Sequence, residues 1–478
     1  MLFPTLDYIF FLPIVVGLFW AIPKRYRLFV IALASLFFYG SWNPKYLILL
    51  VGISLVSWGF GIFIHKKTPV KWVMALLIVT LFIPLLVFKY TDWGIENLNT
   101  LFGILSYEKE LTPLGLALPV GISFFSFQAV AYIVDVYRDR KHSKDPIEFF
   151  SFLAFFPQLV AGPIIRRDEL LPQLKNLQFL NRGMASEGIY RIIKGMIKKL
   201  LIADVIALNL VNAPFEDPTL YTSLELWIAI YAYTIQIYYD FSAYTDIAIG
   251  SGLLFGIRLP ENFFRPYKAT SVAEFWRRWH RTLSNWIRDY IYYPLGGSQV
   301  SSVWRVYLNI MITLVVIGIW HGASWNFVIY GFLHGTAVCV NRWQRKRTGR
   351  KAGMPFPNWF SWFWRFFLTF HFIVLARILF RAEDLSNAWF YFTNLWFNSG
   401  ENPFGLRISP VFDPTYVWLP LIGFAIHFTP ELWEQKIREE FAKIPPVIQA
   451  LVAATAALIC IWWLGNSENA STFIYYEF

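Results

Sequence analysis

The sequence predicts an all-α, polytopic membrane protein with roughly ten to twelve membrane-spanning helices, accompanied by re-entrant or interfacial helices. The first observation behind this prediction is composition. Of the 478 residues, 56% are hydrophobic and only 15% are charged, whereas soluble domains carry about 25% charged residues. The second observation is that several runs without charged residues reach the length of about 20 residues that a helix needs to cross the hydrocarbon core.

The apolar runs are continuous rather than alternating, which identifies the spans as helices and not as strands of a barrel. The clearest runs are Tyr46–Ile64, Trp72–Phe88, Leu111–Val134, Val306–Asn341 and Ile444–Asn466. The longest of them, Val306–Asn341, has enough residues for a helical hairpin. Met1–Ile22 lacks the basic start and the small-residue cleavage pattern of a signal peptide, so we expect it to be a retained membrane helix.

The formal net charge of +11 is better explained by the positive-inside rule than by nucleic-acid binding, because the basic residues gather in alternate loops. Four such clusters follow apolar runs: Lys24, Arg25 and Arg27; His65, Lys66, Lys67 and Lys71; Arg138, Arg140, Lys141 and Lys144; and Arg342, Arg345, Lys346, Arg347, Arg350 and Lys351. This asymmetry places the clusters in the cytoplasm and the N-terminus outside. Membrane lipids with anionic headgroups are the expected partners of these loops, and no nucleic acid is expected.

One membrane domain is predicted over residues 1–478, because no linker or low-complexity segment divides the chain. Most polar groups in apolar surroundings fall between residues 115 and 335. Within this core, Phe149–Ile165 is apolar but short, and both of its flanks are basic and so belong on the same side. We expect this segment to dip into the membrane and return, which points to an internal site.

Arginines and tryptophans alternate between Glu274 and Tyr290. One interpretation is an amphipathic interfacial helix, with tryptophans at headgroup depth and arginines reaching to the surface. That interpretation leaves a role open for His280, which lies in the middle of the stretch. We also expect some of the arginines, among them Arg277 and Arg278, to bind an anionic substrate.

A histidine, His321, lies inside the longest charge-free run, in a Trp-His-Gly segment. An imidazole in the membrane interior is costly unless it has a partner, so His321 is a candidate for function, and a core histidine bonded to a neighbouring helix is the alternative. His334 follows in the same run, and Gly331 and Gly335 flank it, so close helix packing explains it as well as catalysis does. Asn326 is a further candidate for contacting substrate.

Two carboxylates, Asp240 and Asp246, fall within another apolar stretch. An Asp at the centre of a membrane helix costs roughly 2.5–3.5 kcal/mol on insertion scales, and it persists when it is paired or faces a cavity. Asp240 and Tyr244 share a helix face, so both are candidates for contacting substrate. The simpler interpretation is that the carboxylates pair with an arginine and have a structural role. No pair of histidines has metal-ligand spacing, so neither a metal nor a permanently bound cofactor is expected.

Taken in order, these motifs resemble the bacterial membrane-bound O-acyltransferases, in the branch of alginate and peptidoglycan O-acetyltransferases. The matching pieces are Pro119–Phe125, Asp135–Arg138, Phe155–Pro163, Asp240–Asp246, Glu261–Tyr267, Trp276–His280, Trp320–Gly322 and His334–Gly335. The first 65 residues and Phe473–Phe478 also look like the ends of the family's proteins. Two positions depart from the family pattern, because Ala243 stands where Gly is frequent and Gln158 where His is common.

The resemblance implies that His321 is the catalytic histidine and that His280 occupies the second site position. Enzymes of this family move an acyl group from a thioester to a hydroxyl. A histidine with a pKa near 6.5 suits the removal of a hydroxyl proton. His280 would orient the thioester or polarise its carbonyl.

The resemblance also implies an O-acetyltransferase of the bacterial inner (cytoplasmic) membrane that takes acetyl from cytoplasmic acetyl-CoA and delivers it across the membrane to a polysaccharide. Because the predicted outer loops are short, we expect an extracytoplasmic SGNH-type acetyltransferase or polysaccharide-export proteins as partners. The alternative is transfer of D-alanyl from a carrier protein to teichoic acid. A transporter or flippase of lipid-linked sugars would explain the buried carboxylates, but it leaves the Trp-His-Gly segment unexplained.

Overall fold

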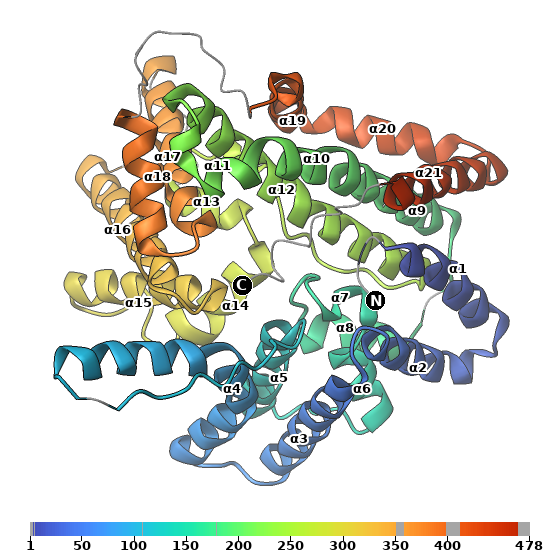
Figure 1. The fold of residues 1–478 in the computed structure, drawn as a ribbon. Helices are drawn as coiled ribbons and strands as arrows, with labels where there is room; N and C mark the ends of the chain where they lie inside the picture. Colours follow the sequence, from blue (N-terminus) through green and yellow to red (C-terminus); the bar gives the residue numbers. More distant parts are fainter. Residues whose placement is uncertain are drawn as a thin grey trace. The chain divides into compact units, whose positions relative to one another are not determined.

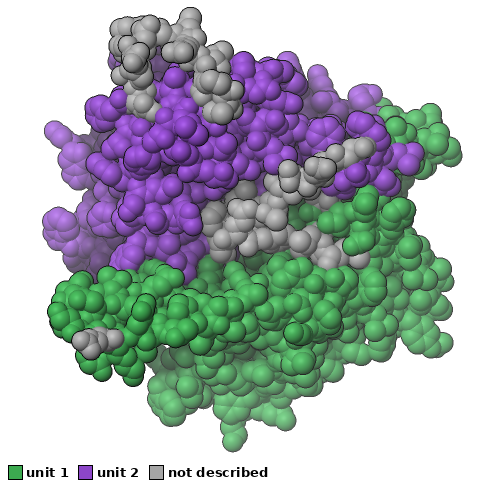
Figure 2. All heavy atoms as spheres, viewed as in Figure 1, with its two compact units in different colours: residues 1–193, 244–260, 441–457 green, residues 194–243, 261–440, 458–478 purple. Residues whose placement is uncertain are grey.

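The computed structural model describes residues 3, 5–107, 109–177, 179–349, 358–397 and 412–466. In these ranges the chain forms helices and connecting segments without any strand, which confirms the all-α class (Figure 1). The chain divides into two compact units: unit 1 comprises residues 1–193, 244–260 and 441–457, and unit 2 comprises residues 194–243, 261–440 and 458–478 (Figure 2). The single membrane domain over residues 1–478 stays a prediction. Met1, Leu2, Pro4, Arg350, Lys351 and the family-like end Phe473–Phe478 lie outside the described residues.

Unit 1 contains the N-terminal helices, the end of α12 and the first part of α21. Its N-terminal helices are α1 (Leu6–Ala21), α2 (Arg27–Gly40), α3 (Leu47–Lys66), α4 (Lys71–Ile104), α5 (Ile122–Asp139), α6 (Pro146–Leu153), α7 (Phe156–Leu159), α8 (Arg167–Lys175) and α9 (Arg182–Met196). Helices α3 and α5 approach closely at Gly61, where an added Cβ would lie only 2.6 Å from the Tyr132 side chain. A small residue at such a crossing is typical of membrane helix packing.

The expected re-entrant segment Phe149–Ile165 forms the end of α6, the single turn of α7 and an irregular stretch, and nearly all its side chains are buried within unit 1. Close packing requires Gly162, because a Cβ there would lie 2.3 Å from the Cα atom of Gln158. The Gln158 amide nitrogen donates to the Phe152 carbonyl at 2.8 Å. Irregular backbone at membrane depth has to be buried in protein, and this segment has that form; its return to the same side stays a prediction.

Unit 2 contains the first part of α12 and most of the C-terminal half of the chain. Its helices are α10 (Asp204–Ile206), α11 (Asn212–Glu216), α12 (Ser223–Leu254), α13 (Val272–Arg278), α14 (Arg281–Ile287), α15 (Val303–His321), α16 (Trp325–Thr348), α17 (Trp359–Arg381), α18 (Leu385–Phe397), α19 (Trp418–Phe428), α20 (Glu431–Lys443) and the end of α21 (Pro446–Asn466). Helices α15 and α16 confirm the predicted hairpin. They touch at Gly318 and Gly331, where a Cβ would lie 2.1 Å and 2.5 Å from carbonyl oxygens of the other helix.

Five helical segments of the described chain are long and apolar enough to cross a membrane: Pro44–Lys66, Lys71–Ile104, Val303–His321, Trp359–Arg381 and Pro446–Gly465. Leu6–Ala21 and Pro414–Phe428 are shorter apolar helices. By this measure the described residues hold fewer spans than the roughly ten to twelve expected from apolar runs. Helices α12 and α16 are also long, but polar and charged residues interrupt their apolar stretches. The chain is a multi-pass membrane protein.

The predicted span Leu111–Val134 is wrong in its first half, because α5 begins only at Ile122. The residues before it run without helical structure beside α4. There the Asp92 carboxylate accepts hydrogen bonds from the amides of Leu114 and Gly115, at 2.7 and 3.0 Å. A run without charges could not reveal that its backbone is held by polar groups of another helix.

Two basic loops of unit 1 adjoin each other. The Nδ1 atom of His65 lies 2.6 Å from the Arg140 carbonyl oxygen, so the loops that contain Lys66 and Lys141 meet. Helix α4 starts beside the first of these loops and continues to Asn97 and beyond. The distance from its start to Asn97 is about 39 Å along the helix axis, which exceeds the hydrocarbon thickness of about 30 Å.

From the positive-inside rule we expect Lys66 and Lys141 to face the cytoplasm and Asn97 to face outward. The measurement is thiol labelling of single-cysteine variants at these positions in intact cells, after replacement of Cys339 and Cys460 by Ser. A membrane-impermeant reagent should label Asn97→Cys and should reach Lys66→Cys and Lys141→Cys only after the membrane is opened. Labelling of position 141 from outside intact cells would contradict this orientation.

Candidate active site

The stretch of alternating arginines and tryptophans breaks into two short helices at His280. Helix α13 ends at Arg278, α14 begins at Arg281, and His280 between them has the left-handed φ of 42°. A residue other than glycine in this region costs about 1–3 kcal/mol and persists only where its surroundings hold it. The single amphipathic interfacial helix is therefore wrong.

The tryptophans of this stretch are buried within unit 2 and do not lie on a surface. Trp276, Trp279 and Trp286 are only 6%, 1% and 3% exposed. Trp279 stacks on Phe275 with ring centroids 5.6 Å apart and meets Phe263 edge-on at 5.0 Å. Phe275 belongs to the same stretch and Phe263 to the segment before it, and both contacts favour burial of a ring that composition alone would place at a membrane surface.

The imidazole of His280 is fully buried among aromatic rings. It meets Phe241 of α12 edge-on with centroids 4.8 Å apart, and Trp320 of α15 at 5.6 Å. Burial lowers the pKa of His280 to about 3, so the ring is neutral at pH 7. A neutral imidazole offers one hydrogen-bond donor and one acceptor.

His321 is the last residue of α15, and it is 2% exposed. Its ring centroid lies 5.0 Å from those of both Trp320 and Phe380. Trp320 therefore neighbours both histidines, His280 through a 5.6 Å contact and His321 through a 5.0 Å contact. The structure brings together the two residues that the sequence singled out as catalytic candidates.

His334 has a packing role in the α15–α16 hairpin. The Trp276 indole nitrogen donates to its Nδ1 atom at 3.1 Å. On either side of it, a Cβ at Gly331 or Gly335 would press against α15, at 2.5 Å from the Leu314 carbonyl oxygen and at 2.8 Å from a methionine sulfur. This is the close packing that the flanking glycines suggested.

A pocket of about 460 Å³ in unit 2 is rich in arginine. We call it the arginine pocket, and its cationic residues are Arg277, Arg281, Arg288, Arg342 and Arg345. No acidic side chain is among its described lining residues. Guanidinium groups bind phosphate and carboxylate in bidentate geometry, so the pocket suits a ligand with several negative charges.

The apolar wall of the arginine pocket belongs to α15. Ile310, Leu314 and Ile317 line it at helical spacing, and His321 stands one turn beyond Ile317 on the same helix. The wall thus leads along one helix face from the arginines toward the histidines. Arg278 does not line the pocket, because its guanidinium is held by the Glu274 carboxylate at 2.7 Å.

Asp240 and Asp246 are both buried in ion pairs. Asp246 pairs with Arg191 at 3.1 Å within unit 1, which confirms an arginine partner. For Asp240 that expectation is wrong, because its partner is Lys199 at 2.8 Å, which also holds Asp204 at 2.8 Å within unit 2. These pairs explain why carboxylates persist in an apolar stretch.

The other candidate substrate residues are not among those that line the arginine pocket. Tyr244 belongs to unit 1, where its ring lies 4.6 Å from that of Phe3. The Asn326 amide nitrogen donates to the Ala382 carbonyl oxygen at 2.9 Å. Both residues are buried, and these contacts give each a packing role, so no geometry here links them to a ligand.

Sequence reasoning missed three arginines near the site. Arg342 and Arg345 were grouped with the cytoplasmic loops, but they line the arginine pocket from α16. Arg377 is fully buried in α17, and no motif of the sequence singled it out. Its signal was present in the sequence, since it is a charge inside the apolar helix Trp359–Arg381.

Unit 2 of this multi-pass membrane protein thus combines two buried histidines with a pocket rich in arginine. The family model of the membrane-bound O-acyltransferases matches residues 57–381, which is more than half of the chain. The chain belongs to this family, and it is therefore an O-acyltransferase.

Several curated proteins are similar to the chain over most of its length. The peptidoglycan O-acetyltransferase of Helicobacter pylori is 40% identical over 388 residues, covering 75% of this chain and 71% of that protein. The "probable alginate O-acetylase" of Azotobacter vinelandii is 37% identical over 390 residues, covering 79% of this chain and 74% of that protein. The teichoic acid D-alanyltransferase of Streptococcus thermophilus is more distant, at 28% identity over 296 residues, 57% of this chain and 70% of that protein.

Proposed function

We propose that the protein transfers acetyl from acetyl-CoA to a hydroxyl group, with His321 as the general base, for O-acetylation of an extracytoplasmic polysaccharide. The observation that carries the proposal is the arrangement along α15 in unit 2. Residues on one face of α15 line the arginine pocket, and His321 is the last residue of this helix. Trp320 contacts both His321 and His280. This order suits a donor with an anionic head and a reactive thioester at its far end.

In the proposed reaction His321 removes the proton from the acceptor hydroxyl as its oxygen attacks the thioester carbonyl carbon. The C–O bond forms, the C–S bond breaks, and the departing thiolate takes up the proton that His321 received. His280, which is buried and neutral, orients the thioester or donates a hydrogen bond to its carbonyl oxygen as negative charge develops there. The aromatic surroundings keep water from competing with the acceptor.

The donor assignment rests on charge. Acetyl-CoA bears several phosphate charges at the end opposite its acetyl group, and the arginine pocket offers five arginines to neutralise them, of which Arg288 also pairs with Asp289 at 2.7 Å. No permanently bound cofactor takes part in this scheme, because acetyl-CoA enters as a substrate. The pocket opens to the cytoplasm in the proposed orientation, in which the N-terminus lies outside and the arginine-rich end of α16 inside.

The acceptor assignment rests on the relatives. Two of the similar proteins are named for peptidoglycan and alginate, so we propose an acceptor in the cell envelope and a place in the bacterial inner membrane. In the cell, an SGNH-type acetyltransferase outside the membrane, or polysaccharide-export proteins, would act together with the protein on the glycan polymer, whereas we expect short glycan fragments to accept acetyl from the purified protein directly. A gene for such an enzyme next to the gene of this protein would support the partnership.

Transfer of D-alanyl from a carrier protein to teichoic acid is the second candidate, favoured by the similarity to the Streptococcus thermophilus enzyme. A carrier protein would present a single phosphodiester to the arginine pocket, which leaves most of its five arginines without a phosphate. Lower identity and shorter coverage also make this candidate weaker than acetyl transfer. The transporter interpretation is set aside, because the family to which the chain belongs consists of acyltransferases.

The experiment that separates the two donors uses the purified protein in lipid vesicles. One reaction contains acetyl-CoA with short alginate and peptidoglycan fragments as acceptors, and another contains a D-alanyl-charged carrier protein with teichoic acid as acceptor. We expect protein-dependent release of free thiol from acetyl-CoA and none from the carrier. Release from the carrier alone would overturn the assignment in favour of D-alanyl transfer.

A further inference from the structure

Arg377 is a charged side chain in an apolar environment. It lies in α17, one of the candidate membrane spans of the described chain, and it is 0% exposed. A charge inside a membrane segment is costly, so such residues are rare and mark functional positions. Neither the proposed catalytic step nor the arginine pocket uses Arg377, which leaves its presence to be explained.

Aromatic side chains surround the Arg377 guanidinium. Its central carbon lies 4.5 Å from the ring centroid of Trp279, 5.3 Å from that of Phe380 and 5.9 Å from that of Phe275. One terminal nitrogen donates to the Tyr330 hydroxyl at 3.5 Å. A cation over an aromatic face is stabilised by the ring electrons, most strongly when both are removed from water, and three rings face this guanidinium.

Two of these rings adjoin the two histidines, one in the sequence and one by contact. Trp279 immediately precedes His280, at the point where the backbone adopts the left-handed conformation. Phe380 lies against His321, with ring centroids 5.0 Å apart. One guanidinium therefore contacts a neighbour of each catalytic candidate, and each neighbour comes from a different segment of unit 2.

We propose that Arg377 is a positioning residue for acyl transfer, which holds His280 and His321 at their working separation through Trp279 and Phe380. This inference rests on the proposed function, since it assigns Arg377 to the same reaction. Arg377 touches neither the donor pocket nor, in this scheme, the reacting atoms. Its loss should thus slow the chemical step and leave donor binding unchanged.

The chemistry of arginine explains why this side chain is suited to the position. A guanidinium is flat and always charged, so it can stack on one ring while its edge donates to a hydroxyl. A lysine keeps the positive charge but loses the flat face and the fork of donors. A methionine keeps much of the length of the side chain and loses its charge. The two substitutions therefore distinguish the contribution of the positive charge from that of the flat guanidinium.

The test compares Arg377→Met and Arg377→Lys with a matched control, Arg381→Met, in vesicles supplied with acetyl-CoA and the acceptor fragments. Arg381 lies one turn further along α17, but it bonds Asn212 at 3.3 Å and covers Phe215. We expect Arg377→Met to lower kcat roughly 100-fold, the effect of a misplacement of about 1 Å, without changing KM for acetyl-CoA. Arg377→Lys should recover part of that loss, and Arg381→Met should keep kcat near that of the unaltered protein.

Folding of each variant is checked by size-exclusion chromatography and by its thermal midpoint. Unchanged kcat in folded Arg377→Met, an equal loss in Arg381→Met, or a change confined to KM would each overturn the positioning role. If Arg377→Met does not fold, Arg377→Lys decides: a lowered kcat at unchanged KM supports the inference, and an unchanged kcat overturns it. Absence of transfer by the unaltered protein would instead overturn the proposed function, and this inference with it.

Discussion

Replacement of His321 by alanine should lower the rate of acyl transfer about 10²- to 10⁴-fold, the usual cost of losing a positioned general base. The side chain is 2% exposed and ends α15 next to Trp320. Alanine at this position removes the ring without breaking the α15–α16 contact, which depends on Gly318 and Gly331. The variant should therefore insert and fold. The measurement is the initial rate of thiol release from acetyl-CoA at saturating acceptor.

His334→Ala is the matched control, because this second buried histidine lies in the same hairpin. Its Nδ1 atom accepts a hydrogen bond from Trp276, so alanine should lower stability and leave the turnover of the folded fraction nearly intact. A folded His321→Ala variant with close to normal transfer would refute the base assignment. His280 would then be the next residue to test.

Replacement of Arg277 by glutamine should raise the KM for acetyl-CoA roughly 10- to 100-fold at unchanged kcat. Hydrogen bonds to charged groups contribute about 1.5–3 kcal/mol, and each 1.4 kcal/mol is about a tenfold change in affinity. Arg277 lines the arginine pocket, whereas the histidines lie beyond its apolar wall. Initial rates over a range of acetyl-CoA concentrations measure both constants.

The neighbouring Arg278 provides an internal control for this prediction. It carries the same charge on the same short helix, but Glu274 holds its guanidinium at 2.7 Å and it does not line the pocket. Arg278→Gln should leave the KM for acetyl-CoA unchanged. Equal KM values for both variants, whether raised or normal, would contradict the assignment of the pocket to the donor.

Much of the fold follows from hydrophobicity alone. The all-α class, the Val306–Asn341 hairpin and the buried character of Phe149–Ile165 were all visible as charge-free runs. His321 was visible for the same reason, because a histidine in a run without charges is conspicuous. The order of the family motifs then singled out His280 as its companion.

Other features depend on contacts between residues far apart in the chain, and sequence patterns do not record such contacts. The helix break at His280 is stabilised by aromatic rings from other segments, such as Phe263 against Trp279. The partner of Asp240 is Lys199, and nothing in the sequence distinguished it from the nearby arginines. Arg342 and Arg345 followed the pattern of a cytoplasmic loop, and only the fold of unit 2 adds them to the pocket.

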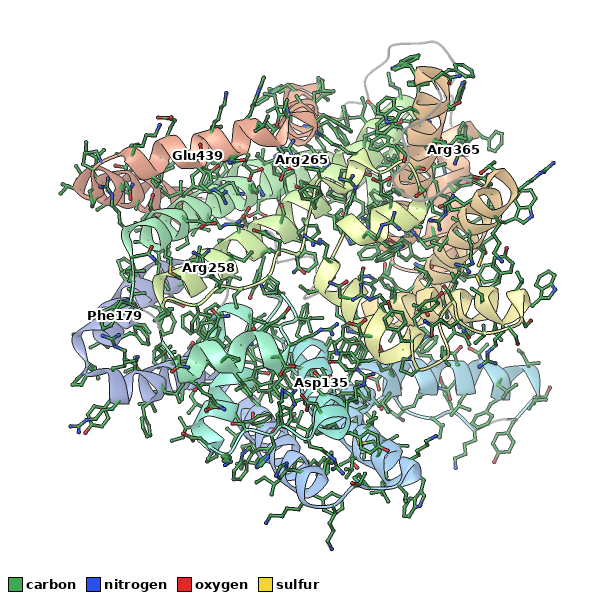
Figure 3. All side chains as sticks on the ribbon, turned by 180° about the vertical axis from the view of Figure 1, so that it is seen from behind. Asp135, Phe179, Arg258, Arg265, Arg365 and Glu439 are labelled. Carbon is green, nitrogen blue, oxygen red and sulfur yellow. The ribbon has the colours of Figure 1, made fainter. Side chains whose placement is uncertain are left out.

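Basic residues can orient a membrane protein and can also bind a ligand, and their positions in the sequence do not distinguish these two roles. Positive-inside residues orient the membrane protein whether or not they also bind a ligand. Arg265, labelled in Figure 3, illustrates the structural use, since it pairs with Glu434 of α20 at 3.6 Å. Arg277 lines a pocket without an acidic neighbour among its lining residues, which is the feature that separates ligand binding from anchoring.

In the proposed reaction, the buried histidines of unit 2 transfer acetyl from a thioester to a hydroxyl. A single-turnover reaction can follow this step, with purified protein in lipid vesicles in excess over acetyl-CoA that is radiolabelled in its acetyl group, and with alginate and peptidoglycan fragments as acceptors. We expect label to appear in an alkali-labile ester on an acceptor with the unaltered protein and to stay in acetyl-CoA with His321→Ala. Equal transfer of label by the two proteins, or label that stays in acetyl-CoA with both, would refute acetyl transfer by these histidines.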